Sequence, residues 1–303
     1  MTYKIFIDGE AGTTGLRIRD RLSARDDIEL VQLDEAHRKD DGARRAAFAE
    51  ADVAILCLPD DAARMAIPMA GETRLIDAST AHRIAPDWTY GMPELPGQRG
   101  RISNALRVAN VGCYATGAIA LLRPLIDAEI MRSDHATVLT GVSGYSGGGK
   151  ASIAAHEAGE APDFSLYALG QDHKHVPEIM TYGGLTRRPL FQPAVGNFAQ
   201  GMVVQLHLHA DLLTGGVPGH ARIEAALRDF YAKDPFVSVV LGGDRLDPQA
   251  LNGTNRMEIG VHGDGRGRVT LTATLDNLGK GASGTAVQNL NLMIGAEETA
   301  GLT

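Results

Sequence analysis

The sequence KIFIDGEAGTTG occupies residues Lys4–Gly15 and begins with an apolar run that predicts a buried strand. The apolar spacing that follows predicts a helix from Leu16 to Leu22. The turn between them offers backbone that a ligand could approach, at Gly9, Gly12, Thr13, Thr14 and Gly15. In a dinucleotide-binding turn, the glycines admit a pyrophosphate and the helix N-terminus attracts its charge. The spacing is Gly-x-x-Gly-x-x-Gly rather than Gly-x-Gly-x-x-Gly, so a tight turn without a ligand remains the alternative.

Strands and helices continue to alternate beyond this turn. Apolar runs predict strands at Ile28–Leu33, Ala51–Leu58, Arg74–Asp77 and Arg107–Val111. A helix is expected at Ala62–Ala70, with Asp60 as its N-cap. Alternation with short connections implies a parallel sheet covered by helices on both faces, as in a Rossmann-like α/β domain.

The end of the second strand carries both signs of charge. An acid here would hold the ribose of NAD, whereas a nearby Arg would accommodate the 2′-phosphate of NADP. The chain places Asp34 and Glu35 first, and Arg38 and Lys39 after them. We expect Arg38 and Lys39 to make NADPH the preferred cofactor; a solvated loop face without a ligand is the alternative.

A second informative stretch is NVGCYATG, residues 110–117. A turn precedes the thiol, and the apolar spacing after it predicts a helix over Ala115–Ile126. Cys113 therefore meets unpaired backbone N–H groups and the positive end of the helix dipole, which favour the nucleophilic thiolate. The alternative is a small buried hydrophobe at a helix start. Cys57 lies within an apolar run and is expected in the core.

The second half adds a glycine-rich segment and a histidine pair. The β-rich run Ala136–Val142 leads into SGYSGGGK, residues 143–150, whose backbone N–H groups and Lys150 could bind an anion; a plain flexible loop is the alternative. The segment HKH carries His173 and His175. A thiol with a separate His is the pattern of Cys-based covalent catalysis. No further cluster at ligand spacing completes a zinc site, so we expect no metal.

The remaining pattern indicates an α+β second domain. Strands are expected at Val203–Ala210, Val237–Leu241, Met257–Val261 and Val269–Asp276, and helices at Ala221–Tyr231 and Thr285–Ile294. We expect a mainly antiparallel sheet and a last helix that packs back on the first domain. The predicted division gives residues 1–113 and 284–303 to the dinucleotide-binding domain and residues 114–283 to the α+β domain.

The composition is that of a globular protein of two domains. Charged residues make up 22% of the 303 residues and the net charge is −8, which excludes a general nucleic-acid footprint. No apolar run approaches the ~18 residues of a membrane span, and the N-terminus lacks a signal-peptide layout. Two cysteines argue for a reducing compartment, so we expect a cytoplasmic protein without nucleic-acid or membrane partners.

Six elements occur in an order that resembles one family: the glycine turn at 9–15, YGMPEL at 90–95, GCYATG at 112–117, SGYSGGG at 143–149, HKHVPEI at 173–179 and DNLGKGA at 276–282. Together they resemble the N-acetyl-γ-glutamyl-phosphate reductase family of arginine biosynthesis, in its short form, within the wider semialdehyde dehydrogenase group. The resemblance implies NADPH-dependent reductive dephosphorylation of a small-molecule acyl phosphate. It also implies a catalytic and dimerisation role for the second domain, in a homo-oligomer that is a dimer or a tetramer.

The resemblance further implies roles for individual residues. The thiolate of Cys113 attacks the acyl phosphate and forms a thioester, which hydride reduces to the semialdehyde. His175 is the expected general acid/base, with His173 as the alternate. Candidates to hold phosphate or the substrate carboxylate are Arg83, Ser146, Gly147 and Lys150. The residues expected beside the cofactor are Ser143, Gly144, Asn277 and Gly279.

One stretch departs from the long form of the family. Where the long form has a Thr-Pro-His-like element, this chain has FQPAVGNF at residues 191–198, so substrate contacts of the long form do not transfer. A related semialdehyde dehydrogenase acting on another acyl phosphate, such as aspartyl phosphate, is a second interpretation. A non-catalytic dinucleotide-binding redox sensor, with Cys113 as the sensing thiol, is a third.

Overall fold

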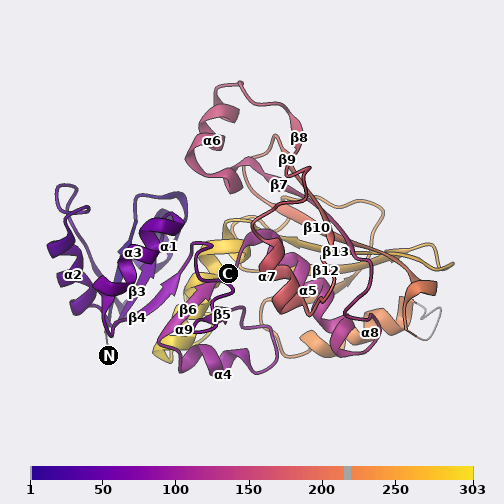
Figure 1. Ribbon diagram of the computed structural model, residues 1–303, viewed down its shortest axis with the longest axis horizontal. Coiled ribbons are helices and arrows are strands. Elements are labelled where there is room, and N and C mark those ends of the chain that lie inside the picture. Colours follow the sequence, from indigo (N-terminus) through magenta and orange to yellow (C-terminus); the bar gives the residue numbers. More distant parts are fainter. Residues whose placement is uncertain (1, 215–219, 303) are drawn as a thin grey trace. The chain divides into compact units, whose positions relative to one another are not determined.

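The computed structural model describes residues 2–214 and 220–302 (Figure 1). Two compact units make up the fold: Met1–Val111 together with Ala282–Thr303, and Gly112–Gly281. This division gives Cys113 to the second unit, whereas the sequence expectation drew the boundary directly after that residue. Among the described residues, no helix combines the length and the hydropathy needed to cross a membrane.

The first unit is built on a six-stranded sheet in the order β2-β1-β3-β4-β6-β5. Its strands are β1 (Tyr3–Asp8), β2 (Ile28–Val31), β3 (Val53–Leu56), β4 (Arg74–Asp77), β5 (Thr89–Gly91) and β6 (Arg107–Asn110). Every neighbouring pair is parallel. The predicted parallel, Rossmann-like sheet is therefore confirmed, with β5 as a short strand that the sequence pattern did not indicate.

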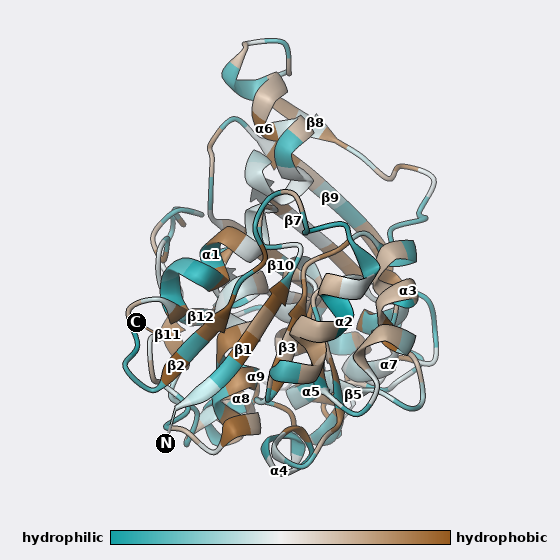
Figure 2. Ribbon diagram, turned by 90° about the vertical axis from the view of Figure 1, so that its left-hand side faces the viewer, coloured by the Kyte–Doolittle hydropathy of each residue, from teal (hydrophilic) through white to brown (hydrophobic). Residues whose placement is uncertain are grey.

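Helices cover both faces of this sheet, because its strands are apolar on both sides. They are α1 (Thr13–Leu22), α2 (Asp41–Glu50), α3 (Asp60–Ala70), α4 (Gln98–Ser103) and α9 (Gly284–Ile294). Along β1, Ile5 and Ile7 join one core cluster, while Phe6 faces the other and packs edge-on against Phe48 of α2, with ring centroids 5.1 Å apart. Figure 2 shows hydrophobic residues concentrated in the strands and hydrophilic residues in the loops and on α1.

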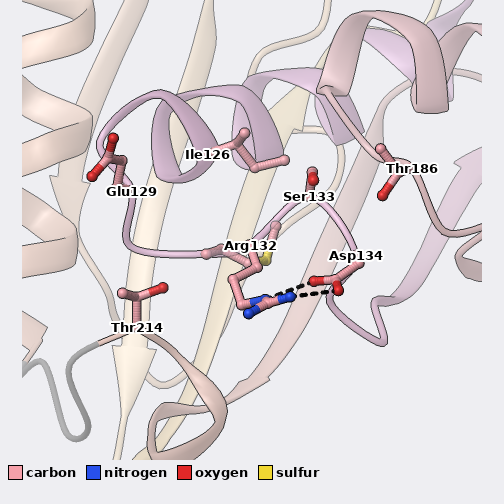
Figure 3. Close-up of a pocket in the computed structure, with 8 residues that line it drawn as sticks. Ile126, Glu129, Arg132, Ser133, Asp134, Thr186 and Thr214 are labelled. Atoms are coloured by element: carbon pink, nitrogen blue, oxygen red, sulfur yellow. Dashed lines mark hydrogen bonds and ion pairs between the residues drawn. The ribbon is translucent and has the colours of Figure 1, made fainter.

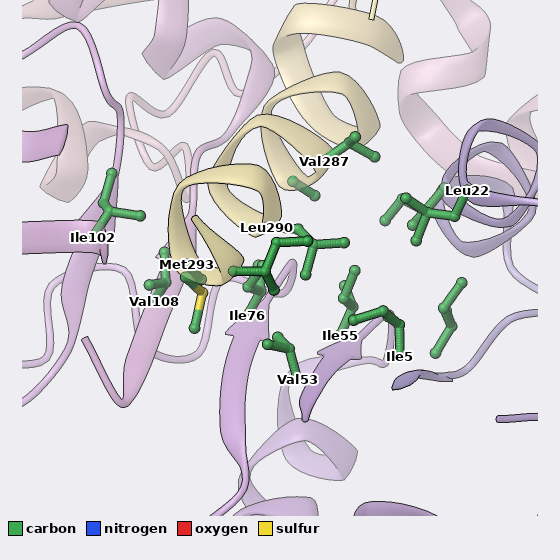
Figure 4. Packing of buried hydrophobic residues seen from close by; sticks show 14 of the residues in the cluster. Ile5, Leu22, Val53, Ile55, Ile76, Ile102, Val108, Val287, Leu290 and Met293 are labelled. Carbon is green, nitrogen blue, oxygen red and sulfur yellow. The ribbon is translucent and has the colours of Figure 1, made fainter. Parts of the chain in front are cut away.

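The last helix returns to the first unit, as expected. α9 packs Val287, Leu290 and Met293 into the cluster that contains Ile76 and Val108 (Figure 4). Most helical stability in proteins comes from such packing of an apolar face. The burial of this face therefore holds the end of the chain on the first sheet.

The expected N-cap role of Asp60 is wrong. Helix α3 begins at Asp60 itself, and Pro59 occupies the N-cap position without a side-chain cap bond. The Asp60 carboxylate instead accepts hydrogen bonds from the backbone N–H of Thr80, at 2.9 Å, and from the Thr80 hydroxyl. The loop after β4 therefore satisfies this acid, a tertiary contact that no local pattern reveals.

The second unit is built on a seven-stranded sheet in the order β11-β12-β13-β10-β7-β9-β8. Its strands are β7 (Val138–Gly144), β8 (Phe164–Leu166), β9 (Leu190–Gly196), β10 (Met202–His209), β11 (Val237–Leu241), β12 (Met257–Gly263) and β13 (Arg268–Leu275). Only the β11–β12 and β7–β9 pairs are parallel, so the sheet is mainly antiparallel, as predicted. The divergent stretch at residues 191–198 forms most of β9.

The helices of the second unit are α5 (Cys113–Asp127), α6 (Gly149–Glu157), α7 (Val176–Gly183) and α8 (His220–Tyr231). Short turns of 3₁₀ or π type occupy Tyr145–Gly148, Ala210–Leu212 and Gly279–Ser283. Helix α5 is almost entirely buried and lies on the sheet, where a Cβ at Gly117 would approach the side chain of Val204 to 2.6 Å. The glycine therefore permits the close packing that sets the position of the helix and of Cys113 at its start.

Candidate active site

Cys113 is the first residue of α5, and the extended backbone of Gly112 forms the N-cap. The Gly112 carbonyl accepts hydrogen bonds from the Thr116 N–H at 2.8 Å and from the Thr116 hydroxyl at 3.0 Å. The Gly112 N–H donates to Oε2 of Glu178, a buried carboxylate on α7, at 3.3 Å. The turn is thus fixed on both sides, and it places the thiol at the positive end of a 15-residue helix, where a thiolate is favoured.

The glycine-containing segment DNLGKGA, residues 276–282, runs directly past the thiol. A Cβ added at Gly281 would come within 2.7 Å of the Cys113 Cβ, so only glycine leaves room for the cysteine there. Asn277 accepts a hydrogen bond from the Gly201 N–H at 2.8 Å and donates to the Ser146 hydroxyl at 3.1 Å. The structure thereby brings together Asn277, which is expected beside the cofactor, and Ser146, which is expected beside the substrate.

The two histidines lie just before α7 and are both buried. The backbone N–H of His175 donates to Nδ1 of His173 at 3.1 Å, and Nε2 of His173 lies 3.3 Å from the Tyr167 hydroxyl. Because Nδ1 accepts a hydrogen bond, the neutral ring carries its proton on Nε2, directed at Tyr167. The two rings meet edge to face with centroids 4.7 Å apart.

Two tyrosines complete this cluster. The Tyr114 hydroxyl donates to the Ala194 carbonyl at 2.6 Å, and its ring centroid lies 5.9 Å from that of His173. Burial, and then the negative charge of a nearby Cys113 thiolate, raise the pKa of Tyr167 above its ordinary value, so its phenol stays a neutral donor. Sequence reasoning missed Tyr167, because a single tyrosine in an irregular loop gives no periodic or motif signal.

The glycine-rich segment after β7 is more ordered than the alternative of a flexible loop suggested. The N–H groups of Gly144, Tyr145 and Ser146 donate to the carbonyls of Gly201, Phe198 and Ala199, at 2.9, 2.9 and 3.1 Å. For these three amides the prediction of anion binding is wrong, because a neighbouring loop already uses them. Ser143 and Ser146 are buried, whereas Gly147 and Lys150 are exposed.

In the first unit, the three glycines at the β1–α1 turn are needed for different physical reasons. Gly9 has φ +89°, and a Cβ at Gly15 would lie 2.7 Å from the Glu10 carbonyl, so the fold itself requires both. A Cβ at Gly12 would meet nothing closer than 3.4 Å. Gly12 is also the N-cap of α1, and it has no side chain that could cap the helix. The helix N-terminus, which begins with Thr13 and Thr14, is therefore suited to an anionic ligand.

A cavity of about 480 Å³ in the first unit adjoins this turn. It is lined by Phe6, Ile7, Asp8, Gly9, Glu10, Ala11, Leu33, Arg38, Lys39, Arg44, Leu58 and Ala62. Arg44, on α2, donates from Nη2 to the buried Asp8 at 2.7 Å, while its Nε is buried without a hydrogen-bond partner. The cavity combines a glycine turn with three cationic side chains, Arg38, Lys39 and Arg44, and the Nε of Arg44 has no hydrogen-bond partner. This lining fits an anionic dinucleotide.

The acids that could have favoured NAD are already bonded within their own turn. Asp34 accepts from the His37 N–H at 2.9 Å and from its ring at 2.7 Å. Glu35 pairs with Arg38 at 2.6 Å. The sequence pattern pointed to Arg38 and Lys39, which line this cavity, but not to Arg44, because a cation 13 residues beyond the end of β2 reaches the cavity only once α2 folds beside β1.

Arg83 lies in the first unit, in the loop after β4, and is 7% exposed. Its Nε donates to the Asn110 carbonyl at 3.0 Å, and its Nη2 lies 3.5 Å from the Ala78 carbonyl and 3.4 Å from that of Val111. These carbonyls stand at the carboxyl ends of β4 and β6, the edge at which parallel sheets bind ligands. The guanidinium is therefore held at the edge where the chain passes from β6 toward Cys113.

Cys57, the other thiol, sits in a different environment. Burial, and then the negative charges of Asp77 and Asp8, raise the pKa of Cys57 to about 12. The thiol is therefore protonated and unreactive at neutral pH. The residue is half-buried and packs against a core cluster of the first unit, whereas the sequence pattern placed it within the core. Within residues 2–214 and 220–302, no three His, Cys, Asp or Glu side chains gather in a way that could hold a metal ion.

A second hollow, of about 470 Å³, lies at the opposite end of α5 (Figure 3). Ile126, Glu129, Ser133 and Thr186 line it, as do Arg132 and Asp134, which form an ion pair with each other. Ile126 is 13 residues from Cys113 along the helix, or about 20 Å at 1.5 Å per residue. None of the predicted site residues lines this hollow.

Comparisons with known proteins agree with this arrangement. The description "Semialdehyde dehydrogenase, NAD binding domain" matches residues 14–105, and "Semialdehyde dehydrogenase, dimerisation domain" matches residues 113–277. Relatives from Brucella ovis and Brucella canis, both named N-acetyl-γ-glutamyl-phosphate reductase, are 50% identical over 97% of this chain and 100% of theirs. The chain belongs to the N-acetyl-γ-glutamyl-phosphate reductase family. The recognition made from the six sequence elements is thus confirmed, and this reductase family is one of nicotinamide-dependent oxidoreductases.

Solved structures show the same fold at low identity to this reductase. Aspartate semialdehyde dehydrogenase II from Vibrio cholerae, complexed with ASA, is 17% identical, with a TM-score of 0.73 over 97% of this chain and 98% of the other. Aspartate semialdehyde dehydrogenase with NADP from Candida albicans is 16% identical, with a TM-score of 0.69 over 97% and 99%. At such identities the likeness concerns the fold alone.

Proposed function

We propose that this protein reduces N-acetyl-γ-glutamyl phosphate to N-acetylglutamate semialdehyde, with NADPH as the reductant and release of phosphate, as a step of arginine biosynthesis. The observation that carries the proposal is Cys113 at the N-terminus of α5. Its charge acts on Tyr167, whose hydroxyl lies 3.3 Å from Nε2 of His173 in the buried histidine pair. The 50% identity to relatives of that name supports the substrate.

The thiolate of Cys113 attacks the acyl carbon, and the C–O bond to phosphate breaks, which leaves a thioester and inorganic phosphate. A thioester accepts hydride where a carboxylate would not, so one difficult reduction becomes two easier steps. The nicotinamide supplies the hydride when bound. A proton must reach the carbonyl oxygen as the thiohemiacetal forms, and that proton leaves again when the C–S bond breaks to give the aldehyde and the thiolate.

His175 is the proposed donor and acceptor of this proton. His173 is less suited, because its Nδ1 already accepts the His175 N–H and would lose that bond on protonation. We therefore assign His173 and Tyr167 to the positioning of His175. The fixed turn at Gly112 and the close approach of Gly281 hold Cys113 in its place beside them.

For the cofactor, we propose that the cavity beside the β1–α1 turn binds the adenosine end of NADP. Gly12 and the start of α1 would hold the pyrophosphate, and Arg38, Lys39 and Arg44 the 2′-phosphate. Ser143, Gly144, Asn277 and Gly279 belong to the nicotinamide end by their motif positions. The pairing of Asp34 with His37 supports NADP over NAD, because that carboxylate is already bonded within the turn.

For the substrate, we propose that Arg83 binds the phosphate, a charge-assisted contact that a guanidinium fork makes well. Ser146, Gly147 and Lys150 are the proposed contacts of the remaining anionic group. Ser146 supports this by its burial and its bond to Asn277. Both cysteines are thiols and not half of a disulfide, which supports a reducing compartment such as the cytoplasm.

We further propose a homo-oligomer in which the second sheet meets a second copy. Strand pairing aligns Leu190, Val138, His207, Thr270 and His262 in one row that contains no Asp, Glu, Lys or Arg. Leu190 and Val138 are 59% and 37% exposed, and the helices α5 and α8 lie against the other face. Interface cores are depleted of charge, as this row is. Leu190→Glu should lower the mass measured by sedimentation; an unchanged mass would exclude this face.

The function is tested in the oxidative direction, with NADP and either N-acetylglutamate semialdehyde or aspartate semialdehyde. The first should be the far better substrate, and steady turnover should need phosphate to release the acyl group from Cys113. Without phosphate, NADPH should appear only as a burst no larger than the enzyme concentration. Sustained turnover without phosphate would show that water resolves the thioester, and the protein would then be a simple aldehyde dehydrogenase.

A further inference from the structure

The carboxyl end of β4 holds a fully buried acid that the proposed chemistry does not use. Asp77 is the last residue of that strand and is 0% exposed. Its carboxylate accepts hydrogen bonds from the Ser79 N–H at 2.9 Å, from the Ser79 hydroxyl at 2.7 Å and from Nδ1 of His82 at 2.6 Å. A buried carboxylate is costly unless donors surround it, so these contacts define one geometry for the segment that follows the strand.

His82 is also held from its other side. Its ring stacks on Trp88, with centroids 4.2 Å apart and planes 11° from parallel. The guanidinium of Arg107 lies 5.8 Å from the centroid of the same Trp88 ring. Stacking fixes the plane of the His82 ring, and the Asp77 bond fixes its rotation within that plane. The backbone at residue 82 is consequently anchored through its side chain.

Arg83 is the next residue along the chain. Its guanidinium lies against the carbonyls of Asn110 and Val111, at the carboxyl edge of the sheet. An arginine recognises phosphate through a rigid planar fork, so its affinity depends on the direction in which the fork points. These carbonyl contacts and the position of the backbone at residue 83 together set that direction, and the anchored His82 immediately precedes this backbone.

We propose that His82, locked by Asp77, is a positioning residue that orients Arg83 toward the phosphate of the substrate. This inference rests on the proposed function, in which Arg83 binds that phosphate. According to this inference, the Asp77–His82 contact affects the affinity for phosphate. The contact takes no part in proton transfer or hydride transfer. His82 therefore acts through Arg83 and not on the reacting atoms.

Two substitutions of His82 separate its two contacts. His82→Asn keeps a side-chain N–H near the place of Nδ1 but removes the stack on Trp88; His82→Phe keeps the stack and removes the donor. In the oxidative assay with phosphate varied, His82→Phe should raise the KM for phosphate about tenfold, the size of one lost hydrogen bond to a charged group, with kcat nearly unchanged. His82→Asn should stay within about threefold of the parent.

A control separates positioning from loss of stability. Thr73→Val removes a hydroxyl that donates to the Phe48 carbonyl at 2.8 Å in the same unit, away from Arg83. It should lower the melting temperature without moving the KM for phosphate. The dissociation constant for NADP, measured by fluorescence, should be unchanged in every variant. If His82→Phe does not fold, Asp77→Asn weakens the same contact and should raise the same KM.

The outcomes distinguish this inference from the proposed function. Arg83→Ala should raise the KM for phosphate more than His82→Phe does. If Arg83→Ala raises it and the His82 variants leave it unchanged, the positioning role is wrong and the proposed function stands. Equal effects of His82→Asn and His82→Phe would also overturn it, because the Asp77 contact would then not be the cause. Turnover that never depends on phosphate would overturn the proposed function itself.

Discussion

Nδ1 of His173 accepts a hydrogen bond of 3.1 Å from the backbone N–H of His175. This contact settles the tautomer of His173, because an accepting nitrogen carries no proton. The ring then presents Nε2–H to the Tyr167 hydroxyl, 3.3 Å away. The motif His-Lys-His thus contains two residues of different character: one ring tied to its own backbone, and one in the position proposed for the acid/base.

The first prediction concerns this division of roles. His175→Asn should lower kcat by roughly 10²–10⁴-fold, the usual contribution of a general acid/base. His173→Asn should cost less, because an amide can still accept the His175 N–H. Steady-state kinetics of both variants, with circular dichroism to verify folding, make the comparison. A near-silent His175→Asn beside a severely impaired His173→Asn would transfer the role to His173.

The second prediction concerns the two thiols. Cys113→Ser should bind NADPH normally and lose nearly all turnover, because a serine hydroxyl lacks the thiolate. Since the pKa of Cys57 is raised to about 12, its thiol stays protonated at pH 8 and should resist iodoacetamide, while Cys113 is alkylated. Mass spectrometry of the labelled peptides identifies the reactive site. Preferential labelling of Cys57 in the folded protein would contradict this.

The third prediction concerns the buried acid beside the nucleophile. Glu178 accepts the Gly112 N–H at the turn that places Cys113. Glu178→Ala should lower kcat by up to about 10²-fold, because small displacements of a reacting group are costly. Glu178→Gln keeps an acceptor oxygen and should recover part of the rate. The rate of Cys113 alkylation should follow the same order; identical rates in both variants and the parent would show that this contact has no positioning role.

The fourth prediction concerns cofactor choice. Arg44→Ala should weaken the binding of NADP more than that of NAD, because the substitution removes a cation from the cavity wall. The substitution is combined with Asp8→Asn in a double variant, because Arg44→Ala alone would leave the buried Asp8 carboxylate without its Arg44 partner. Calorimetric titration of both cofactors against this double variant, with Arg38→Ala for comparison, measures the preference. An unchanged ratio of the two affinities in this double variant would remove Arg44 from the proposed 2′-phosphate site.

The local sequence was sufficient for much of the fold. Runs such as Lys4–Asp8 and Arg74–Asp77 are short and apolar on both faces, which is the pattern of a parallel, doubly covered sheet. The spacing from Ala115 to Ile126 similarly gave α5, although the helix begins two residues earlier, at Cys113 itself. Periodicity identifies such elements because each one buries a face that its own residues define.

The residues of the candidate site also fall into a group that local sequence could predict and a group that it could not. Chemistry that a single segment carries, the thiol at a helix start and the glycines before α1, could be predicted from the sequence, since the dipole and the open backbone are local properties. Tertiary structure alone decided which amides of residues 144–146 were still available, which groups meet the His173 ring, and that Arg44 reaches the cavity beside the β1–α1 turn. Two of these depend on a partner far away in the chain: Gly201 for Gly144, and Asp8 for Arg44. The partners of His173 are only two and six residues away, His175 and Tyr167, but no helix or strand repeat brings them to its ring. Local sequence cannot specify such contacts, because they exist only after the strands and helices have packed.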